Sequence, residues 1–147
     1  MIRIAKRDDI TTLAAFQVLM ARETEDLELH PDTVRDGVSA VFDDPYKGFY
    51  LLTEENEEIV ASLMITYEWS DWRAQTVWYI QSLYVKPEWR KKGIYRAMYE
   101  HLKEMIKNDN TVCGIRLYVD KTNTRAQKAY EALGMDGEHY RFYEDMK

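Results

Sequence analysis

Two long strand-like segments on either side of a short turn restrict what this chain can fold into. Residues 59–69 and 75–85 are rich in β-branched and aromatic side chains, which favour strands. Residues 70–72 lie between them in a pattern typical of a turn. Pro87 follows the second segment, and proline cannot donate a hydrogen bond to a strand ladder. The sequence therefore predicts two adjacent strands, the second of which ends in a loop.

Helical and strand-like patterns alternate along the rest of the chain. Alternating apolar and polar residues predict strands, and apolar residues at helical spacing predict helices. The predicted strands are 2–5, 49–53, 112–119 and 138–146, and the predicted helices follow Asp8 or Asp9 and cover 34–42, 91–107 and 123–133. This order predicts an α/β fold, in the broad sense that includes α+β, with helices on both faces of a central mixed sheet. No stretch resembles a linker, so we expect residues 1–147 to form a single domain.

The charge of the chain restricts its partners. Asp and Glu number 26 against 20 Lys and Arg, which gives a formal net charge of -6. We expect no nucleic-acid partner, because phosphate backbones are held by many Lys and Arg contacts, whereas a cationic substrate would be attracted. Cys113 is the only cysteine, so no intrachain disulfide can form, which fits a reducing cytoplasm. The sequence shows neither the apolar core of a signal peptide nor a run long enough to span a bilayer, so we expect a cytoplasmic protein without a membrane partner.

Three cations lie where a helix is expected to begin. Arg90, Lys91 and Lys92 are unfavourable there unless an anion binds, because a helix start carries partial positive charge. Free amides at the helix start can cradle phosphate oxygens, and Gly93 lets the backbone approach closely. The segment matches neither a P-loop nor a dinucleotide-binding fingerprint. A solvated basic patch is the alternative, and charge alone does not separate the two.

The segment from 83 to 95 resembles the acetyl-CoA signature of the GNAT family of N-acetyltransferases. In that family a strand ends in Leu-Tyr-Val, and x-Pro and Arg/Gln-x-x-Gly-x-Gly/Ala follow. Leu83-Tyr84-Val85, Pro87, Arg90 and Gly93 match this pattern, whereas Tyr95 stands where the family has a small residue.

A second block supports the resemblance. Residues 123–135 are similar to the family's later motif, Asn-x-x-Ala-x-x-x-Tyr-x-x-x-Gly-Phe/Met. Two separate blocks are more specific than either alone. The resemblance implies the acyl-CoA N-acyltransferase fold, in which strands splayed apart at Val85 and Val119 admit the pantetheine arm of acetyl-CoA.

The resemblance also implies which residues bind the cofactor. Leu83 and Val85 would pair their backbone groups with the pantetheine arm, the amides of residues 90–95 would hold the diphosphate, and Asn123 would lie near the pantetheine. The full implied set is Leu83, Tyr84, Val85, Arg90, Lys91, Lys92, Gly93, Ile94, Tyr95, Asn123 and Ala126. No metal is expected, because the three histidines are isolated and no Cys/His ligand spacing occurs.

Acyl transfer to an amine requires a neutral amine and a protonated leaving group. An alkyl amine has a pKa of roughly 10.4 and a thiol roughly 8.5. With the resemblance, Tyr130 is predicted to protonate or hydrogen-bond the leaving thiolate, because it shares a helical face with Ala126 and Leu133. A core tyrosine with a satisfied hydroxyl is the alternative.

Fewer residues of the sequence point to the binding site of the amine acceptor. Gln81 stands where the similar diamine and polyamine acetyltransferases carry a glutamate, and it could orient a water or the substrate. Glu68, on the preceding strand, could reach the same cleft. Glu25 and Glu28 could attract an ammonium group, because they lie in the acidic segment between the first two predicted helices. Solvated carboxylates are the alternative for each of these glutamates.

Three functions remain open at this point. The first is an N-acetyltransferase acting on a primary amine of a small molecule, which the short chain favours. The second is a protein acetyltransferase acting on lysines or N-termini, and the third is a non-catalytic CoA-binding regulatory module. Aromatic residues in the strands at 67–79 and 140–143 offer apolar surface for a homodimer.

Overall fold

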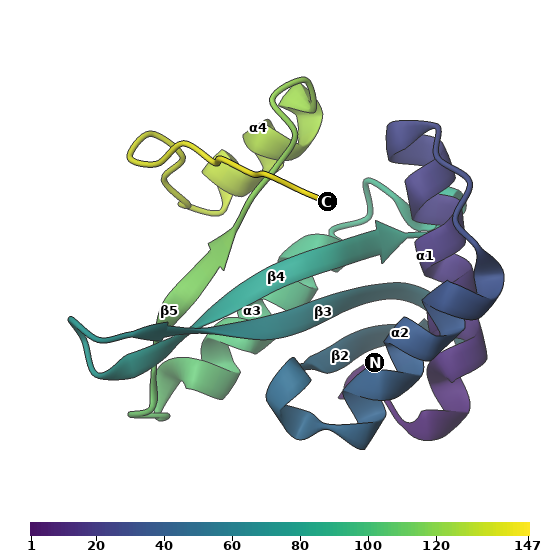
Figure 1. The fold of residues 1–147 in the computed structure, drawn as a ribbon, viewed down its shortest axis with the longest axis horizontal. Helices are drawn as coiled ribbons and strands as arrows, with labels where there is room; N and C mark the ends of the chain where they lie inside the picture. Colours follow the sequence, from purple (N-terminus) through teal and green to yellow (C-terminus); the bar gives the residue numbers. More distant parts are fainter. The chain divides into compact units, whose positions relative to one another are not determined.

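The fold is built on a five-stranded sheet with helices packed against it, and the computed structural model describes all residues, 1–147 (Figure 1). The elements are β1 (Ile2–Ile4), α1 (Ile10–Glu25), α2 (Pro31–Asp43), β2 (Phe49–Glu55), β3 (Glu58–Ser70), β4 (Gln75–Val85), α3 (Ile94–Lys107), β5 (Val112–Leu117) and α4 (Thr124–Ala132). Short 3-10 turns cover Arg7–Asp9, Pro45–Lys47 and Pro87–Trp89. The chain divides into two compact units, Met1–Arg116 and Leu117–Lys147.

The strands lie in the order β1-β2-β3-β4-β5. The first four form antiparallel neighbours, and the β3–β4 ladder runs from Ser70 opposite Gln75 to Ala61 opposite Val85. Strand β5 begins beside the start of β4, because the Thr76 amide donates to the carbonyl of Thr111 at 2.8 Å. The two strands therefore run in the same direction. The predicted hairpin and mixed sheet are confirmed.

Helices cover both faces of the sheet in the first unit. Tyr50, Leu52 and Met64 join residues of α1 and α2 in one core cluster. Leu51 and Leu63 are fully buried on the opposite face, because consecutive strand residues point to opposite sides. Helix α3 lies on that side and is itself buried at Met98 and Leu102 (Figure 1). Two covered faces explain the nearly continuous apolar run in β3.

Arg3 ties β1 to the start of α1 and to β2. Its guanidinium donates to the Asp9 carboxylate at 2.8 and 2.9 Å and to Glu54 Oε1 at 2.6 Å. Asp9 also accepts from the Lys6 amide at 2.6 Å, so it does not cap α1 with its side chain, contrary to the expected cap. The hydrogen bond from Arg3 holds the pKa of Asp9 below its usual value. This cluster fixes the N-terminal strand.

The predicted strand at 138–146 is wrong, because this segment has no regular secondary structure. Tyr140 and Tyr143 are each 83% exposed, so the aromatic residues do not bury one face as a sheet strand would. The ring of Phe142 stacks on that of Tyr118, with centroids 4.8 Å apart. Alternation alone therefore gave a false signal here.

No helix combines the length and apolar character needed to cross a bilayer.

Candidate functional site

Strand β4 contains a bulge just before its end. Gln81 is opposite Met64 and Tyr84 is opposite Ser62, so residues 82 and 83 together face only Leu63. Ser82 has a φ of 55°, a left-handed conformation that is uncommon outside glycine. A bulge interrupts the ladder and re-aims the local backbone, and bulges recur next to active sites. Sequence reasoning missed this feature, because nothing in the strand pattern marks Ser82 as left-handed.

The last residue of β4 directs its backbone away from β3. The Lys86 amide donates to the carbonyl of Val60 at 2.9 Å, so Lys86 and Val60 form a hydrogen-bonded pair. The adjacent pair, Val85 and Ala61, is then of the non-hydrogen-bonded kind, and its N–H and C=O groups point outward. Val85 therefore presents backbone groups on the open side of the strand.

The loop between β4 and α3 has the backbone shape of an anion site. Lys91 has a φ of 63° and Gly93 a φ of 77°, and α3 begins at the next residue, Ile94. Left-handed residues of this kind turn successive N–H groups toward one concavity. The first amides of α3 also point out of the helix end, and Gly93 supplies no side-chain cap. The predicted helix at 91–107 starts later than expected because of these conformations.

The three loop cations are placed differently from one another. Arg90 turns back toward the protein, where its Nε donates to the Val85 carbonyl at 2.8 Å and its NH2 group to Glu23 at 2.6 Å. Lys92 lies over the ring of Trp89, with its ammonium 4.6 Å from the centroid. Lys91 is exposed. An anion at the loop would therefore meet backbone amides and two lysines, with the arginine as a brace behind them.

Tyr84 lies near the end of β4, before this loop, and Tyr95 lies in α3, after it. The Tyr84 ring is buried against Phe16 of α1, with centroids 4.7 Å apart, and the Arg90 guanidinium lies 5.8 Å from its centre. Burial raises the pKa of Tyr84. Tyr95, at the position where a small residue was expected, is half-buried in the first turn of α3, and its ring lies 6.4 Å from that of Tyr99.

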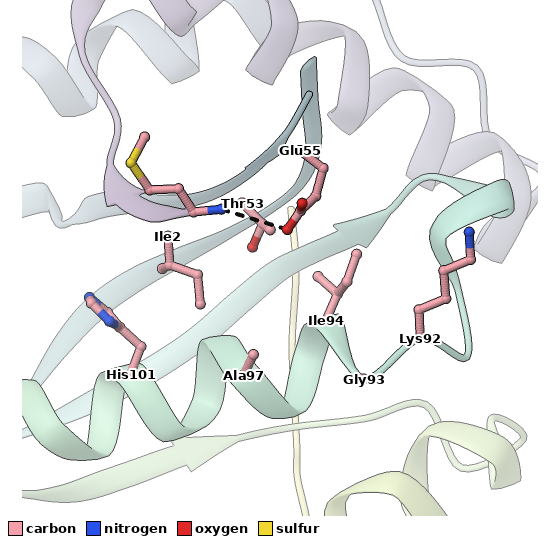
Figure 2. Close-up of a pocket in the computed structure, with 9 residues that line it drawn as sticks. Ile2, Thr53, Glu55, Lys92, Gly93, Ile94, Ala97 and His101 are labelled. Carbon is pink, nitrogen blue, oxygen red and sulfur yellow. Dashed lines mark ion pairs between the residues drawn. The ribbon is translucent and has the colours of Figure 1, made fainter. Parts of the chain in front are cut away.

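A pocket of about 450 Å³ lies beside the same loop (Figure 2). Its lining comes from the N-terminus with β1, from β2, from the end of the β4–α3 loop and from α3: Met1, Ile2, Thr53, Glu55, Lys92, Gly93, Ile94, Ala97 and His101. The N-terminal ammonium lies 3.6 Å from Glu55 Oε1, the ion pair drawn in Figure 2. Sequence reasoning missed this pocket, because no motif links its three elements. It leaves Lys92 and Gly93 accessible from the side of the N-terminal strands.

The candidate acceptor residues of β3 and β4 are separated. Gln81 donates from Nε2 to the sulfur of Met64 at 3.2 Å, which leaves its Oε1 as an acceptor. Glu68 accepts from Arg116 at 2.7 Å. Since Gln81 is opposite Met64, Glu68 lies four residues further along β3, about 13 Å away at strand spacing. The structure does not bring these two residues together.

The acidic segment after α1 is partly neutralised. Arg22 donates to both carboxylate oxygens of Glu28, at 2.7 and 2.9 Å, and this contact lowers the pKa of Glu28. Glu25 ends α1 and is exposed. Asp26 follows in a left-handed conformation and donates its amide to Ala21, which closes the helix. Glu25 is therefore the more available of the two predicted carboxylates.

In the second unit, Asn123 immediately precedes α4. The Asn123 Oδ1 accepts from the Ala126 amide at 3.1 Å, so Asn123 caps the helix. Its side-chain amide nitrogen is left as a hydrogen-bond donor. Gln127 donates to the carbonyls of Asp120 and Lys121, at 3.1 Å each. These contacts hold the segment before α4 in place around Asn123.

Tyr130 lies on the less exposed face of α4, together with Ala126 and Leu133, as expected from helical spacing. Burial raises the pKa of Tyr130 above its usual value of 10.0, so its hydroxyl stays protonated at neutral pH. This is the form that a proton donor requires. Gly134, which follows the C-terminal end of this helix, has a φ of 83° and donates its amide to the Glu131 carbonyl at 2.9 Å.

No group of three or more His, Cys, Asp or Glu side chains is placed to hold a metal ion. The predicted cofactor residues belong to both units, with residues 83–95 in the first and residues 123–126 in the second.

Comparison with known proteins identifies relatives of this chain. Its residues 10–135 match the description "Acetyltransferase (GNAT) family". The crystal structure of a possible acetyltransferase from Clostridium difficile 630 is 41% identical, with a TM-score of 0.93 over 100% of this chain and 97% of that chain. No curated protein matches the chain.

More distant structures share the fold. A predicted acetyltransferase with acetyl-CoA from Clostridium acetobutylicum is 19% identical, with a TM-score of 0.75 over 98% of this chain and 95% of that one. A ribosomal-protein-alanine N-acetyltransferase from Brucella melitensis biovar Abortus 2308 is 13% identical, with a TM-score of 0.80 over 100% and 99%. At these identities the likeness concerns the fold alone.

Proposed function

The chain belongs to the acetyltransferase (GNAT) family and is an N-acetyltransferase, and we propose that it transfers the acetyl group of acetyl-CoA to a primary amine of a small molecule. The conformation of the loop between β4 and α3 is the observation that supports acetyl-CoA as the acetyl donor. Its left-handed residues, Lys91 and Gly93, and the open start of α3 form a backbone site for the diphosphate. Lys91 and Lys92 add positive charge beside it. An acidic protein has little other reason to place cations at a helix start.

The end of β4 suits the pantetheine arm. The outward backbone groups of Val85 and the re-aimed backbone at Leu83 offer hydrogen bonds along the open side of the strand. Because the Val85 carbonyl already accepts a hydrogen bond from Arg90, the Val85 amide is the backbone group available to the pantetheine arm. We propose that Asn123 and Ala126 also bind the cofactor, with the side-chain amide nitrogen of Asn123 as the hydrogen-bond donor.

Tyr130 is proposed as the proton donor of the reaction. The amine nitrogen bonds to the thioester carbonyl carbon, the carbon–sulfur bond breaks, and the hydroxyl of Tyr130 gives its proton to the departing sulfur. The ammonium acceptor loses one proton to solvent to become a neutral amine, and a second when its nitrogen bonds to the acetyl carbon. One of these replaces the proton that Tyr130 gave to sulfur, and the other is the net proton released. The Tyr130 hydroxyl, whose pKa burial raises above 10.0, is protonated throughout the neutral range, which is the form that this role requires.

The acceptor is proposed to be cationic in solution. The net charge of -6 favours its approach, and the exposed Glu25 has a carboxylate available to an ammonium group. Gln81 is proposed to orient the acceptor or a water through its free Oε1. Glu28 and Glu68 are less available to an ammonium group, because Arg22 and Arg116 already neutralise their carboxylates.

A thiol-release assay tests this function. The protein is incubated with acetyl-CoA and a panel of diamines, polyamines, amino acids, a lysine peptide and peptides with free N-termini, and free CoA is measured. Turnover with a small amine supports the proposal. Turnover with peptides alone would favour a protein acetyltransferase, and tight CoA binding without turnover on any amine would favour a non-catalytic CoA-binding module.

We further propose a single-domain, cytoplasmic protein that forms a homodimer. Trp69 and Trp72, at the β3–β4 turn, are 66% and 93% exposed and offer apolar surface for pairing. Sedimentation at micromolar concentration is expected to show a dimer, and a monomer alone would reject the pairing.

A further inference from the structure

The side chain of Arg90 joins three parts of the first unit. Its Nε donates to the Val85 carbonyl at 2.8 Å, its NH2 group donates to Glu23 Oε2 at 2.6 Å, and its guanidinium lies 5.8 Å from the centre of the Tyr84 ring. Val85 ends β4, Arg90 lies in the loop before α3, and Glu23 lies near the end of α1. The arginine therefore braces the loop against a strand and a helix.

Glu23 is held in a position that suits this contact. Phe16 of α1 packs on Tyr84 at 4.7 Å between ring centroids, and Glu23 follows Phe16 by two helical turns on the same face. The Glu23 and Arg90 side chains are 37% and 34% exposed, so the ion pair is neither buried nor fully solvated. The packed aromatic pair beside it limits how far the helix and strand can move apart.

The direction of the Arg90 side chain has a consequence for the donor site. Its guanidinium is committed to Val85 and Glu23, so the proposed diphosphate site consists of the backbone amides that follow Arg90 and the two lysines. A loop already held in its binding shape loses less conformational freedom when a ligand binds. Without Glu23, the guanidinium keeps only its bond to the Val85 carbonyl and its place over the Tyr84 ring.

We propose that Glu23 is a positioning residue for acetyl-CoA: through its ion pair with Arg90 it holds the β4–α3 loop in the shape that binds the diphosphate. This proposal rests on the proposed function and adds to it a residue of α1, outside both signature blocks. It assigns Glu23 an effect on donor binding and none on the chemical step.

The test uses the full-length protein and compares Glu23→Gln with Glu104→Gln as a matched control. Glu104 pairs with Lys107 at the far end of α3, so both substitutions remove one negative charge and one ion pair, but only the first breaks an ion pair with the β4–α3 loop. We expect Glu23→Gln to raise the Kd for CoA and the KM for acetyl-CoA about two- to fivefold, the range of a partly exposed ion pair. The kcat at saturating acetyl-CoA is expected to stay within about twofold. Glu104→Gln is expected to leave the Kd for CoA and the KM for acetyl-CoA unchanged.

Three further measurements separate a positioning role of Glu23 from an effect on general stability. Glu23→Asp keeps the charge and is expected to recover part of the affinity. The ratio of Kd values between Glu23→Gln and wild type is expected to approach one as salt is raised, because the ion pair is screened. The melting temperature without ligand is recorded for each variant.

Two results would overturn the positioning role of Glu23 alone, and a third would also reject the proposed function. An unchanged Kd for Glu23→Gln would overturn the positioning role, and a lower Kd would mean that Glu23 withholds Arg90 from the diphosphate, which also overturns it. Both results leave the proposed function intact, because wild type still binds CoA. If wild type itself bound no CoA, the proposed function and this inference would both be rejected.

Discussion

Gly93 allows the backbone part of the donor site to be tested by a single methyl group. Its φ of 77° is left-handed, and a Cβ built there would meet no atom within 4 Å. A Gly93→Ala substitution therefore tests conformation without a steric clash. Gly37, inside α2, is the matched control, because a Cβ there also meets nothing within 4 Å and its φ is not positive.

The two substitutions are expected to change the free energy of unfolding in opposite directions. A left-handed alanine costs about 1–2 kcal/mol, partly offset by the smaller entropy of its unfolded chain. Gly37→Ala is expected to stabilise the protein by about 1 kcal/mol, because alanine is the better helix former. The melting temperature should move by roughly 2–4 °C per kcal/mol, downward for Gly93→Ala and upward for Gly37→Ala.

Binding should separate the two variants further. If alanine shifts the backbone at residue 93, at least one amide–phosphate hydrogen bond is lost, which costs about 1.5–3 kcal/mol. The Kd of Gly93→Ala for CoA is then expected to rise about tenfold or more, and that of Gly37→Ala to stay unchanged. Calorimetric titration with CoA and thermal unfolding measure both effects. Equal affinity in wild type and Gly93→Ala would refute the backbone argument.

Two further predictions concern proton donation and acid stability. Tyr130→Phe is expected to lower kcat about a hundredfold or more while leaving the Kd for CoA unchanged, and unchanged turnover would remove Tyr130 from the mechanism. Because burial raises the pKa of Tyr130 above 10.0, any loss of wild-type activity through its ionisation should appear only above pH 10 in a rate profile. Asp9→Asn is expected to lower the free energy of unfolding by about 1.5–3 kcal/mol at pH 7, because it removes a charged partner of Arg3. The pKa of Asp9 is depressed below 3.8 in the folded state, so this stabilisation is present above pH 3.8 and disappears as the pH falls through the folded value. Urea unfolding should therefore show a smaller difference at pH 2 than at pH 7, and an equal difference at both would contradict the assigned role of the ion pair.

The parts of the fold that follow local patterns were predictable from the sequence. The predicted strand 75–85 coincides with β4, and the predicted turn lies between β3 and β4. The cations before α3 favour an anion site because they oppose the charge of a helix start, and that site stays a prediction. In each case the signal lies within a few consecutive residues.

The remaining features depend on contacts that no local pattern encodes. The bulge at Ser82 requires a left-handed residue that the sequence does not mark, and the bond between Glu23 and Arg90 joins residues 67 positions apart. The strand expected at 138–146 failed for a related reason. Alternating aromatic residues form a strand only when a neighbouring strand and a covering layer are present, and Tyr140 is 83% exposed.

The most direct test of the account is an NMR titration of the labelled protein with CoA, following each backbone amide. If the loop between β4 and α3 holds the diphosphate, the largest amide shifts should fall at residues 91–95. Titration with pantetheine alone, which lacks the diphosphate, should leave those amides nearly unmoved. Binding of CoA with large shifts elsewhere and none at Gly93 and Ile94 would contradict the account.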